Sequence, residues 1–95
     1  MTRVELTELA RQDLDSLVQT RELPASTYAR VADSLESLRI APLAGRALAG
    51  RYDGLRLVVG PWGWIALLYE YLEADDLVLV VGVMDGRSRG APNAS

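Results

Sequence analysis

LRLVVGPWGWIALLYEYLEADDLVLVVGVM, residues 55–84, is the stretch of the sequence that decides the fold. It holds runs of β-branched and aromatic residues at 55–59, 64–71 and 77–84, separated by turn-forming or charged residues. This pattern predicts three strands joined in an antiparallel meander. The first connection, Gly60-Pro61-Trp62-Gly63, has proline second and glycine fourth, which predicts a type I turn.

The residues before this stretch predict one more strand and two helices. Apolar and polar residues alternate over 3–6, as in a half-buried strand, and Thr7 can cap the helix that follows. Two apolar stripes with helical spacing then predict helices from Glu8 to about Thr20, and from Pro24 or Ser26 to about residue 40. The stripes consist of Ala10, Leu14, Leu17 and Val18, and of Tyr28, Val31, Leu35 and Leu38.

These elements predict an α+β domain of order β-α-α-β-β-β(-β), with a helical hairpin packed on one face of a mainly antiparallel sheet. At 95 residues the chain is long enough for one hydrophobic core and too short for two. We assign residues 1–87 to this single domain. Residues 88–95 have nothing to bury, so we expect a disordered tail there.

The other face of the predicted sheet is unusually apolar. Residues 65–68 and 78–81 are apolar at every position, whereas a face exposed to water would carry alternating polar residues. Something is therefore expected to cover this face. The candidates are the neighbours of the first strand, a second copy of the chain in a homodimer, or a segment of a partner protein.

Composition excludes several classes of chemistry. The chain has 0 Cys and 0 His, and all of its 10 cationic residues are arginine, so we expect no metal site, no cofactor and no Schiff-base lysine. The longest apolar run is far shorter than the roughly 20 residues that cross a bilayer, and the N-terminus has no apolar signal core. We expect a cytoplasmic protein without membrane contact.

Charge is distributed unevenly. The net charge is -3, yet four arginines and one acid lie between residues 39 and 56. This cluster, which includes Arg46 and Arg51, is either a solvated edge of the fold or a patch that contacts an anionic target.

Several short motifs follow one another along the chain in an order found in a known protein family. They are Val4-Glu5-Leu6-Thr7, Ala10 to Leu14, Leu35 with Leu38, then Pro42, Gly45, Leu48 and Gly50, then Leu55 to Gly60, Tyr69, and Val80 to Arg87. In order and spacing they resemble the RelE/ParE superfamily of bacterial toxins from type II toxin-antitoxin pairs. The resemblance implies a β-α-α-β-β-β fold and an antitoxin whose extended segment wraps the toxin.

The resemblance also implies an activity, which it leaves open between two branches. RelE-like members cleave messenger RNA on the ribosome, and ParE-like members poison DNA gyrase. Here Ala66 stands where the family has a strand arginine, Arg87 is the match to its final arginine, and Asn93 lies near the place of its C-terminal tyrosine. Whether the chain is an enzyme therefore stays undecided.

The residues themselves offer few partners for RNA cleavage, which needs a base, an acid and a cation. The base could be Glu70 or Asp85, and the cation Arg56 or Arg87. If Val59 faces Trp64 across the first hairpin, Arg56 lies opposite Leu67. A second loop of five residues then places Arg56, Tyr69 and Asp85 on one face of the sheet. Glu70 points to the other face. Arg87 would then lie roughly 20 Å from Arg56 at ~3.4 Å per residue, too far for one active site.

Two tryptophans flank Gly63 at the predicted hairpin tip. Trp62 and Trp64 either pack as a lid over the end of the sheet or form an exposed anchor for a protein or a nucleobase. We expect both, together with Arg46, Arg51 and Tyr69, to bind a target or partner. The acidic composition favours a protein partner over RNA.

Two functions remain open. The first is a toxin that a cognate antitoxin neutralises and that acts on messenger RNA, on the ribosome or on a protein such as gyrase. The alternative is a binding or scaffold module with the toxin fold and no catalytic activity, which works through the apolar sheet face and the tryptophan hairpin.

Overall fold

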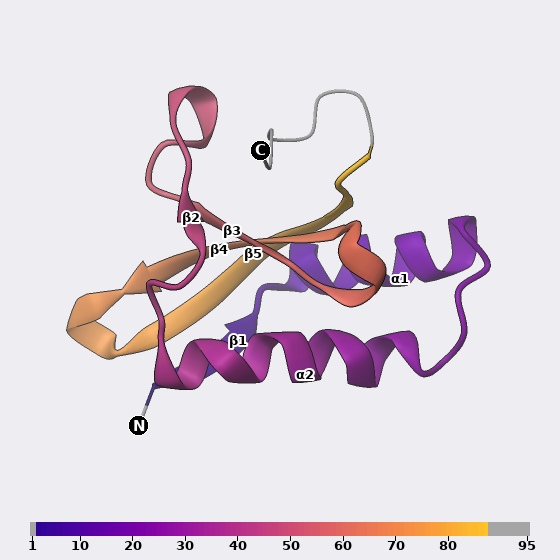
Figure 1. Ribbon diagram of the computed structural model, residues 1–95, viewed down its shortest axis with the longest axis horizontal. Coiled ribbons are helices and arrows are strands. Elements are labelled where there is room, and N and C mark those ends of the chain that lie inside the picture. Colours follow the sequence, from indigo (N-terminus) through magenta and orange to yellow (C-terminus); the bar gives the residue numbers. More distant parts are fainter. Residues whose placement is uncertain (1, 88–95) are drawn as a thin grey trace.

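Two helices cover one face of a five-stranded sheet in the computed structural model, which describes residues 2–87 (Figure 1). This arrangement confirms the predicted α+β fold with its helical hairpin on one face. The expected tail over 88–95 lies outside the described residues. The elements are β1 Arg3–Leu6, α1 Glu8–Thr20, α2 Thr27–Ile40, β2 Arg46–Ala47, η1 Gly50–Tyr52, β3 Arg56–Val59, η2 Pro61–Gly63, β4 Ile65–Leu72, η3 Glu73–Asp75 and β5 Leu77–Asp85, where η marks a short 3-10 turn.

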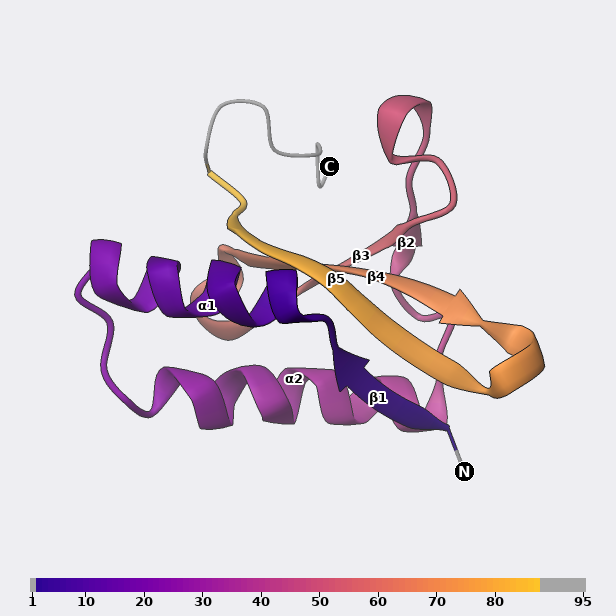
Figure 2. The ribbon, with the colours of Figure 1, turned by 180° about the vertical axis from the view of Figure 1, so that it is seen from behind.

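The strand order is β1-β5-β4-β3-β2, so β1 and β2 form the two edges of the sheet. The pairs β2–β3, β3–β4 and β4–β5 are antiparallel, and β1 runs parallel to β5. The backbone N–H groups of Arg3 and Thr7 donate to Asp76 and Val80 at 3.1 and 3.0 Å, one at each end of the parallel pair. Figure 2 shows β1 beside β5 and leading directly into α1. None of the helices over residues 2–87 is long and apolar enough to cross a membrane.

Local sequence explains where the first helix begins and how it covers the sheet. The hydroxyl oxygen of Thr7 accepts a hydrogen bond from the Ala10 N–H at 3.1 Å, as expected of the residue that caps a helix. Asp13 reaches β5 from the helix, and its carboxylate accepts a hydrogen bond from the Val83 N–H at 3.2 Å. β1 pairs only with residues 77–80 of β5, and Asp13 of α1 provides a hydrogen-bond acceptor for the β5 backbone after that point.

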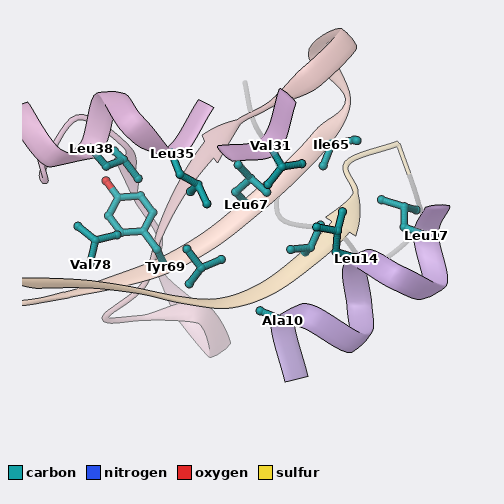
Figure 3. Close-up of a cluster of buried hydrophobic side chains, with 12 residues drawn as sticks. Ala10, Leu14, Leu17, Val31, Leu35, Leu38, Ile65, Leu67, Tyr69 and Val78 are labelled. Atoms are coloured by element: carbon teal, nitrogen blue, oxygen red, sulfur yellow. The ribbon is translucent and has the colours of Figure 1, made fainter. Parts of the chain in front are cut away.

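The core lies between the helices and the sheet (Figure 3). Most of both predicted apolar stripes points into it, because α1 buries Ala10, Leu14 and Leu17 and α2 buries Val31, Leu35 and Leu38. Tyr28, the first member of the second stripe, is exposed instead. From the sheet, Ile65, Leu67 and Tyr69 of β4 meet them. Burying a large apolar side chain contributes about 1.5–3 kcal/mol relative to its exposed state, so this layer holds the hairpin in place.

A second, smaller cluster lies on the opposite face of the sheet. Its buried members are Leu57, Ala66 and Leu68, and it is packed against by Leu48 and Tyr52. Leu48 and Tyr52 come from the segment 46–55, which folds back over this face. The sequence correctly indicates that the face needs a cover. It does not identify this segment as part of that cover, because the segment lacks a strong periodic pattern.

The register of the first hairpin differs from the prediction by two residues. Val59 pairs with Ala66 and Arg56 with Tyr69, rather than with Trp64 and Leu67. The connection is also not a type I turn, since Trp62 has φ 57° and ψ 10°. A shift of two residues keeps each side chain on its predicted face. Arg56 and Tyr69 therefore share the helix-covered face. The second loop is one residue shorter than predicted, because Leu72 pairs with Leu77, and an irregularity between Leu68 and Tyr69 returns Asp85 to the helix-covered face, where it pairs with Ile65.

Candidate functional site

Arg56, a predicted catalytic cation, is engaged in holding a loop. Its Nη1 donates to the carbonyl oxygens of Leu43 at 3.2 Å and Gly45 at 2.7 Å, in the connection between α2 and β2. An arginine bound to two backbone carbonyls is positioned to fix the chain path. These two bonds engage Arg56 in holding the loop, and the catalytic role expected for it stays a prediction.

Tyr69 was predicted to bind a partner, and the structure corrects this. The side chain is 0% exposed and lies in the helix-side core. Its hydroxyl donates to the Pro42 carbonyl at 2.9 Å and accepts from the Gly45 N–H at 2.8 Å. Burial raises the pKa of the Tyr69 phenol. Tyr69 offers no surface to a partner because an aromatic side chain at this spacing packs inward with the rest of β4.

Arg46 and Arg51 lie on the exposed side of the segment that covers the far face. Arg46 is at the start of the short strand β2, opposite Leu57. The Arg51 guanidinium lies 5.0 Å from the ring centroid of Tyr52, and its Nη2 donates to the Tyr52 hydroxyl at 3.2 Å. Both side chains are accessible, and their role in binding an anionic target remains a prediction.

The two tryptophans come together with arginines from distant parts of the chain. The rings of Trp62 and Trp64 stack at a centroid distance of 6.2 Å and an interplanar angle of 22°. The guanidinium of Arg30, from α2, lies 5.5 Å from the Trp62 centroid, and that of Arg87 lies 4.0 Å from the Trp64 centroid. We call these four residues the tryptophan-arginine stack. Guanidinium groups at these distances are attracted electrostatically to the ring faces.

Asp85 anchors one end of the stack. Arg87 donates to it from Nε and Nη2, each at 3.0 Å, and Arg21 at the end of α1 donates from Nε at 3.2 Å. Asp85 is only 6% exposed. The hydrogen bonds from Arg87, joined by that from Arg21, hold the pKa of Asp85 far below its usual range. A general base needs a pKa raised toward neutrality, so Asp85 does not fit the predicted role of base.

Gly86 allows the chain to bring Arg87 over Trp64. The Gly86 N–H donates to the Trp64 carbonyl at 2.7 Å. A Cβ at this position would lie 2.9 Å from the same carbonyl oxygen, closer than real Cβ contacts allow. The Asp-Gly-Arg sequence at the end of β5 thus supplies an ion-pair acceptor, a close backbone approach and a cation in three successive positions.

A small pocket opens beside the stack on the far face of the sheet. Its volume is about 80 Å³. It is lined by Leu57, Val59, Gly63, Trp64, Ala66, Gly86 and Arg87. Arg56 does not line this pocket. It lies opposite Tyr69 in β4. Arg87 instead follows Asp85, which pairs with Ile65 at the other end of β4. The two predicted catalytic arginines are thus not brought together at the pocket.

A larger groove lies on the helix side, between α1, α2 and the edge strand β1. Its volume is about 360 Å³, and we call it the helix groove. Apolar side chains from all three elements line it, and charged residues stand around them. The lining consists of Val4, Leu6, Arg11, Leu14, Asp15, Tyr28, Val31, Ala32, Leu35, Glu36 and Arg39.

Sequence reasoning misses both the helix groove and two arginines of the stack region. Arg21, just after α1, and Arg30, in α2, are far along the chain from the tryptophans, and neither stands in a local motif. The groove residues belong to the same apolar stripes as the core, so spacing alone does not distinguish them. Tyr28, which its spacing assigns to the same stripe, is exposed in the fold and lines the groove. Residues 2–87 contain no group of three or more His, Cys, Asp or Glu residues that could hold a metal ion.

Comparison with known proteins identifies the fold. No family model matches the chain, and no curated protein sequence matches it. Among solved structures, a chain of the toxin-antitoxin complex RelBE2 from Mycobacterium tuberculosis is similar with a TM-score of 0.69 and 26% identity, over 88% of this chain and 96% of that chain.

Two further structures agree at lower identity. A chain of the chromosomal ParDE toxin-antitoxin system from P. aeruginosa has a TM-score of 0.70 and 11% identity, covering 90% of this chain and 96% of its own. A chain of the intact E. coli RelBE toxin-antitoxin complex has a TM-score of 0.61 and 14% identity, covering 93% and 100%. The chain has the RelE/ParE toxin fold, as its sequence motifs predict.

Proposed function

We propose that this chain, which has the RelE/ParE toxin fold, is the toxin of a toxin-antitoxin pair and is neutralised by a cognate antitoxin. The observation that carries the proposal is the likeness to a chain of the RelBE2 complex, at 26% identity over 88% of this chain. A fold alone does not assign a function, so the surfaces that this chain presents must support the proposal as well.

The site chemistry favours a toxin that binds its target over one that cleaves RNA. Cleavage needs a base and an acid near a cation that stabilises the pentavalent phosphate. Asp85 is held ionised by Arg87 and Arg21, and the pocket beside Arg87 is lined mainly by apolar groups. Arg56 donates to backbone carbonyls of a loop. We therefore assign the toxic effect to binding of a protein target.

The helix groove is the surface that we assign to the antitoxin. It is wide enough for several apolar side chains of a partner segment, with Val4, Leu6 and Ala32 among the residues that would contact them. Its charged residues are of both signs, since Arg11 and Arg39 are accompanied by Asp15 and Glu36. Mixed charges around an apolar centre are typical of an interface that selects one partner.

The first experiment is controlled expression of the chain in bacteria. We expect induction to arrest growth, and co-expression of the reading frame adjacent to its gene to restore it. Primer extension on total messenger RNA should show no new cleavage sites after induction. Growth that continues normally would contradict the toxin assignment, and new cleavage sites would contradict the binding mode.

A pair of variants tests the antitoxin surface. Ala32 lines the helix groove, whereas Ala29, on the same helix, is exposed outside it. We expect Ala32→Arg to fill the groove, to weaken binding of the antitoxin by tenfold or more, and to keep the toxin active during co-expression. Ala29→Arg should leave neutralisation unchanged. Equal neutralisation of both variants would place the antitoxin elsewhere.

A binding module without toxicity is the second candidate. The exposed Trp62, at 45% exposure, favours it because a free tryptophan serves a scaffold as well as a toxin. Under this alternative the chain still binds the product of the adjacent gene, and its induction leaves growth unchanged. The growth experiment therefore separates the two candidates.

A further inference from the structure

We infer that the tryptophan-arginine stack and the adjacent far-face pocket form a second binding surface, which takes an acidic protein segment carrying an aliphatic side chain. The aliphatic side chain enters the pocket, a neighbouring carboxylate pairs with Arg30, and the charge of Arg87 adds to the local positive potential. This surface lies apart from the helix groove. The inference goes beyond the proposed function, because it holds whether the bound protein is the target of a toxin or the partner of a scaffold.

The backbone of Trp62 gives the first argument. Its φ of 57° lies in the left-handed region, which is unfavourable for an L-residue and is normally occupied by glycine. The large side chain is 45% exposed, so burial does not fully account for its presence. A bulky, exposed residue kept in a strained conformation indicates a site of recognition.

The pocket gives the second argument, because its size and lining fit an aliphatic group. Leu57, Val59 and Ala66 supply apolar walls, and Val59 is itself 45% exposed at the surface. Reading a nucleobase requires several hydrogen-bonding groups around its edges. Arg87 is the polar side chain in this lining, and two of its nitrogens already donate to Asp85. A leucine, isoleucine or methionine side chain matches this environment better than a base does.

Charge gives the third argument. Arg30 and Arg87 present cations at the two ends of the stack, and Asp85, which is bonded to Arg87, is shared with a third cation, Arg21. The chain as a whole has a net charge of -3. A local cationic surface on an acidic protein favours a short acidic segment. A long nucleic acid backbone would also lie against the negatively charged rest of the protein surface, which repels it.

The test begins with an unbiased selection, followed by a site-specific titration. A phage-displayed random dodecapeptide pool is selected on the full chain, with counter-selection on the Trp62→Gly variant. Glycine suits the left-handed conformation, so this variant should fold as well as the original protein. We expect the enriched peptides to carry Asp or Glu next to Leu, Ile or Met.

Intrinsic fluorescence then reports binding at this surface, because the chain contains only 2 tryptophans and both belong to the stack. Addition of an enriched peptide should shift the emission in a saturable way. Arg30→Gln should weaken binding about tenfold, as expected when a cationic hot-spot residue is lost. Arg3→Gln, which removes an exposed arginine of β1, is the matched control and should leave the affinity unchanged.

Three outcomes would overturn the inference. They are an enriched pool without acidic residues, peptides that bind Trp62→Gly as tightly as the original chain, and octauridylate RNA that shifts the fluorescence at lower concentration than any selected peptide. None of these depends on toxicity, so failure here is distinguishable from failure of the growth experiment.

Discussion

The backbone N–H of Gly45 donates a hydrogen bond of 2.8 Å to the hydroxyl of Tyr69, a core residue of the middle strand. The same hydroxyl donates to the carbonyl of Pro42 at 2.9 Å. One phenol therefore satisfies a donor and an acceptor of the connection between α2 and β2. Arg56 binds the Gly45 carbonyl from the neighbouring strand, so the connection is fixed from two sides.

Tyr69→Phe should destabilise the fold. The substitution keeps the buried ring but leaves the Gly45 N–H and the Pro42 carbonyl without their partner, at a cost of about 1–3 kcal/mol. Urea unfolding followed by circular dichroism measures the loss. Tyr28→Phe, which removes an exposed hydroxyl bonded to Asp15, is the control and should change the midpoint much less. Equal shifts in the two variants would contradict the role assigned to the Tyr69 hydroxyl.

Gly45→Ala should destabilise the fold by crowding the same contact. A Cβ on Gly45 would lie 2.5 Å from the Tyr69 hydroxyl oxygen, so the loop or the ring must move, typically at about 1–3 kcal/mol. Gly82→Ala is the matched control, because its Cβ would find only ordinary contacts from 3.6 Å outward. Thermal unfolding of both variants checks the expectation, which is refuted if Gly82→Ala is the less stable.

Stability should fall as the pH drops below about 4. Hydrogen bonds from the hydroxyls of Thr2 at 2.7 Å and Tyr71 at 2.8 Å lower the pKa of Asp76 in the folded state. The unfolded chain then binds more protons than the folded one in this range, so the stabilisation is present above the ordinary pKa of 3.8 and is lost as the pH falls through the folded value.

Asp76→Asn tests this pH dependence. Asp76 has φ 47°, a conformation that asparagine also tolerates. Urea unfolding of both proteins between pH 7 and pH 3 should show a shallower loss in the variant. The loss should not vanish, because the lowered pKa of Asp85 acts in the same direction. An identical pH dependence in both proteins would exclude a contribution from Asp76.

Gly86→Ala should change the environment of Trp64. The added Cβ meets the Trp64 carbonyl at 2.9 Å, so the Asp85-Gly86-Arg87 segment must shift and Arg87 must leave its place over the ring. We expect a change in the tryptophan emission and near-ultraviolet circular dichroism. Gly82→Ala in the same strand should preserve both spectra. Unchanged spectra in Gly86→Ala would show that the close approach of Gly86 does not position Arg87.

The sequence predicts the elements well because strong periodic patterns are local. Strands and helices begin and end within a few residues of the predicted positions, and the caps and stops that set them stand next to them in sequence. The hairpin register is off by two residues because Trp62 adopts a conformation that its residue type disfavours. A rule based on typical turn chemistry does not anticipate such a residue.

The site is predicted less completely, since most of its contacts join distant positions. The sequence singles out both tryptophans and Arg87, but Arg30 and Arg21 reach them only through packing of the helices. Tyr69 is assigned to a surface although it is buried, because matching a motif carries no information about which way a side chain points. Asp85 is a candidate base in sequence and a bonded anion in the fold.

The parallel pairing of β1 with β5 has a consequence for synthesis. Residues 3–6 leave the ribosome long before their partners at 77–80 are translated, so the earliest strand has no place to dock. The sheet is therefore completed only when almost the whole described region has been made. Nascent intermediates therefore lack the finished sheet against which the helices pack, so the described fold is reached only late in synthesis.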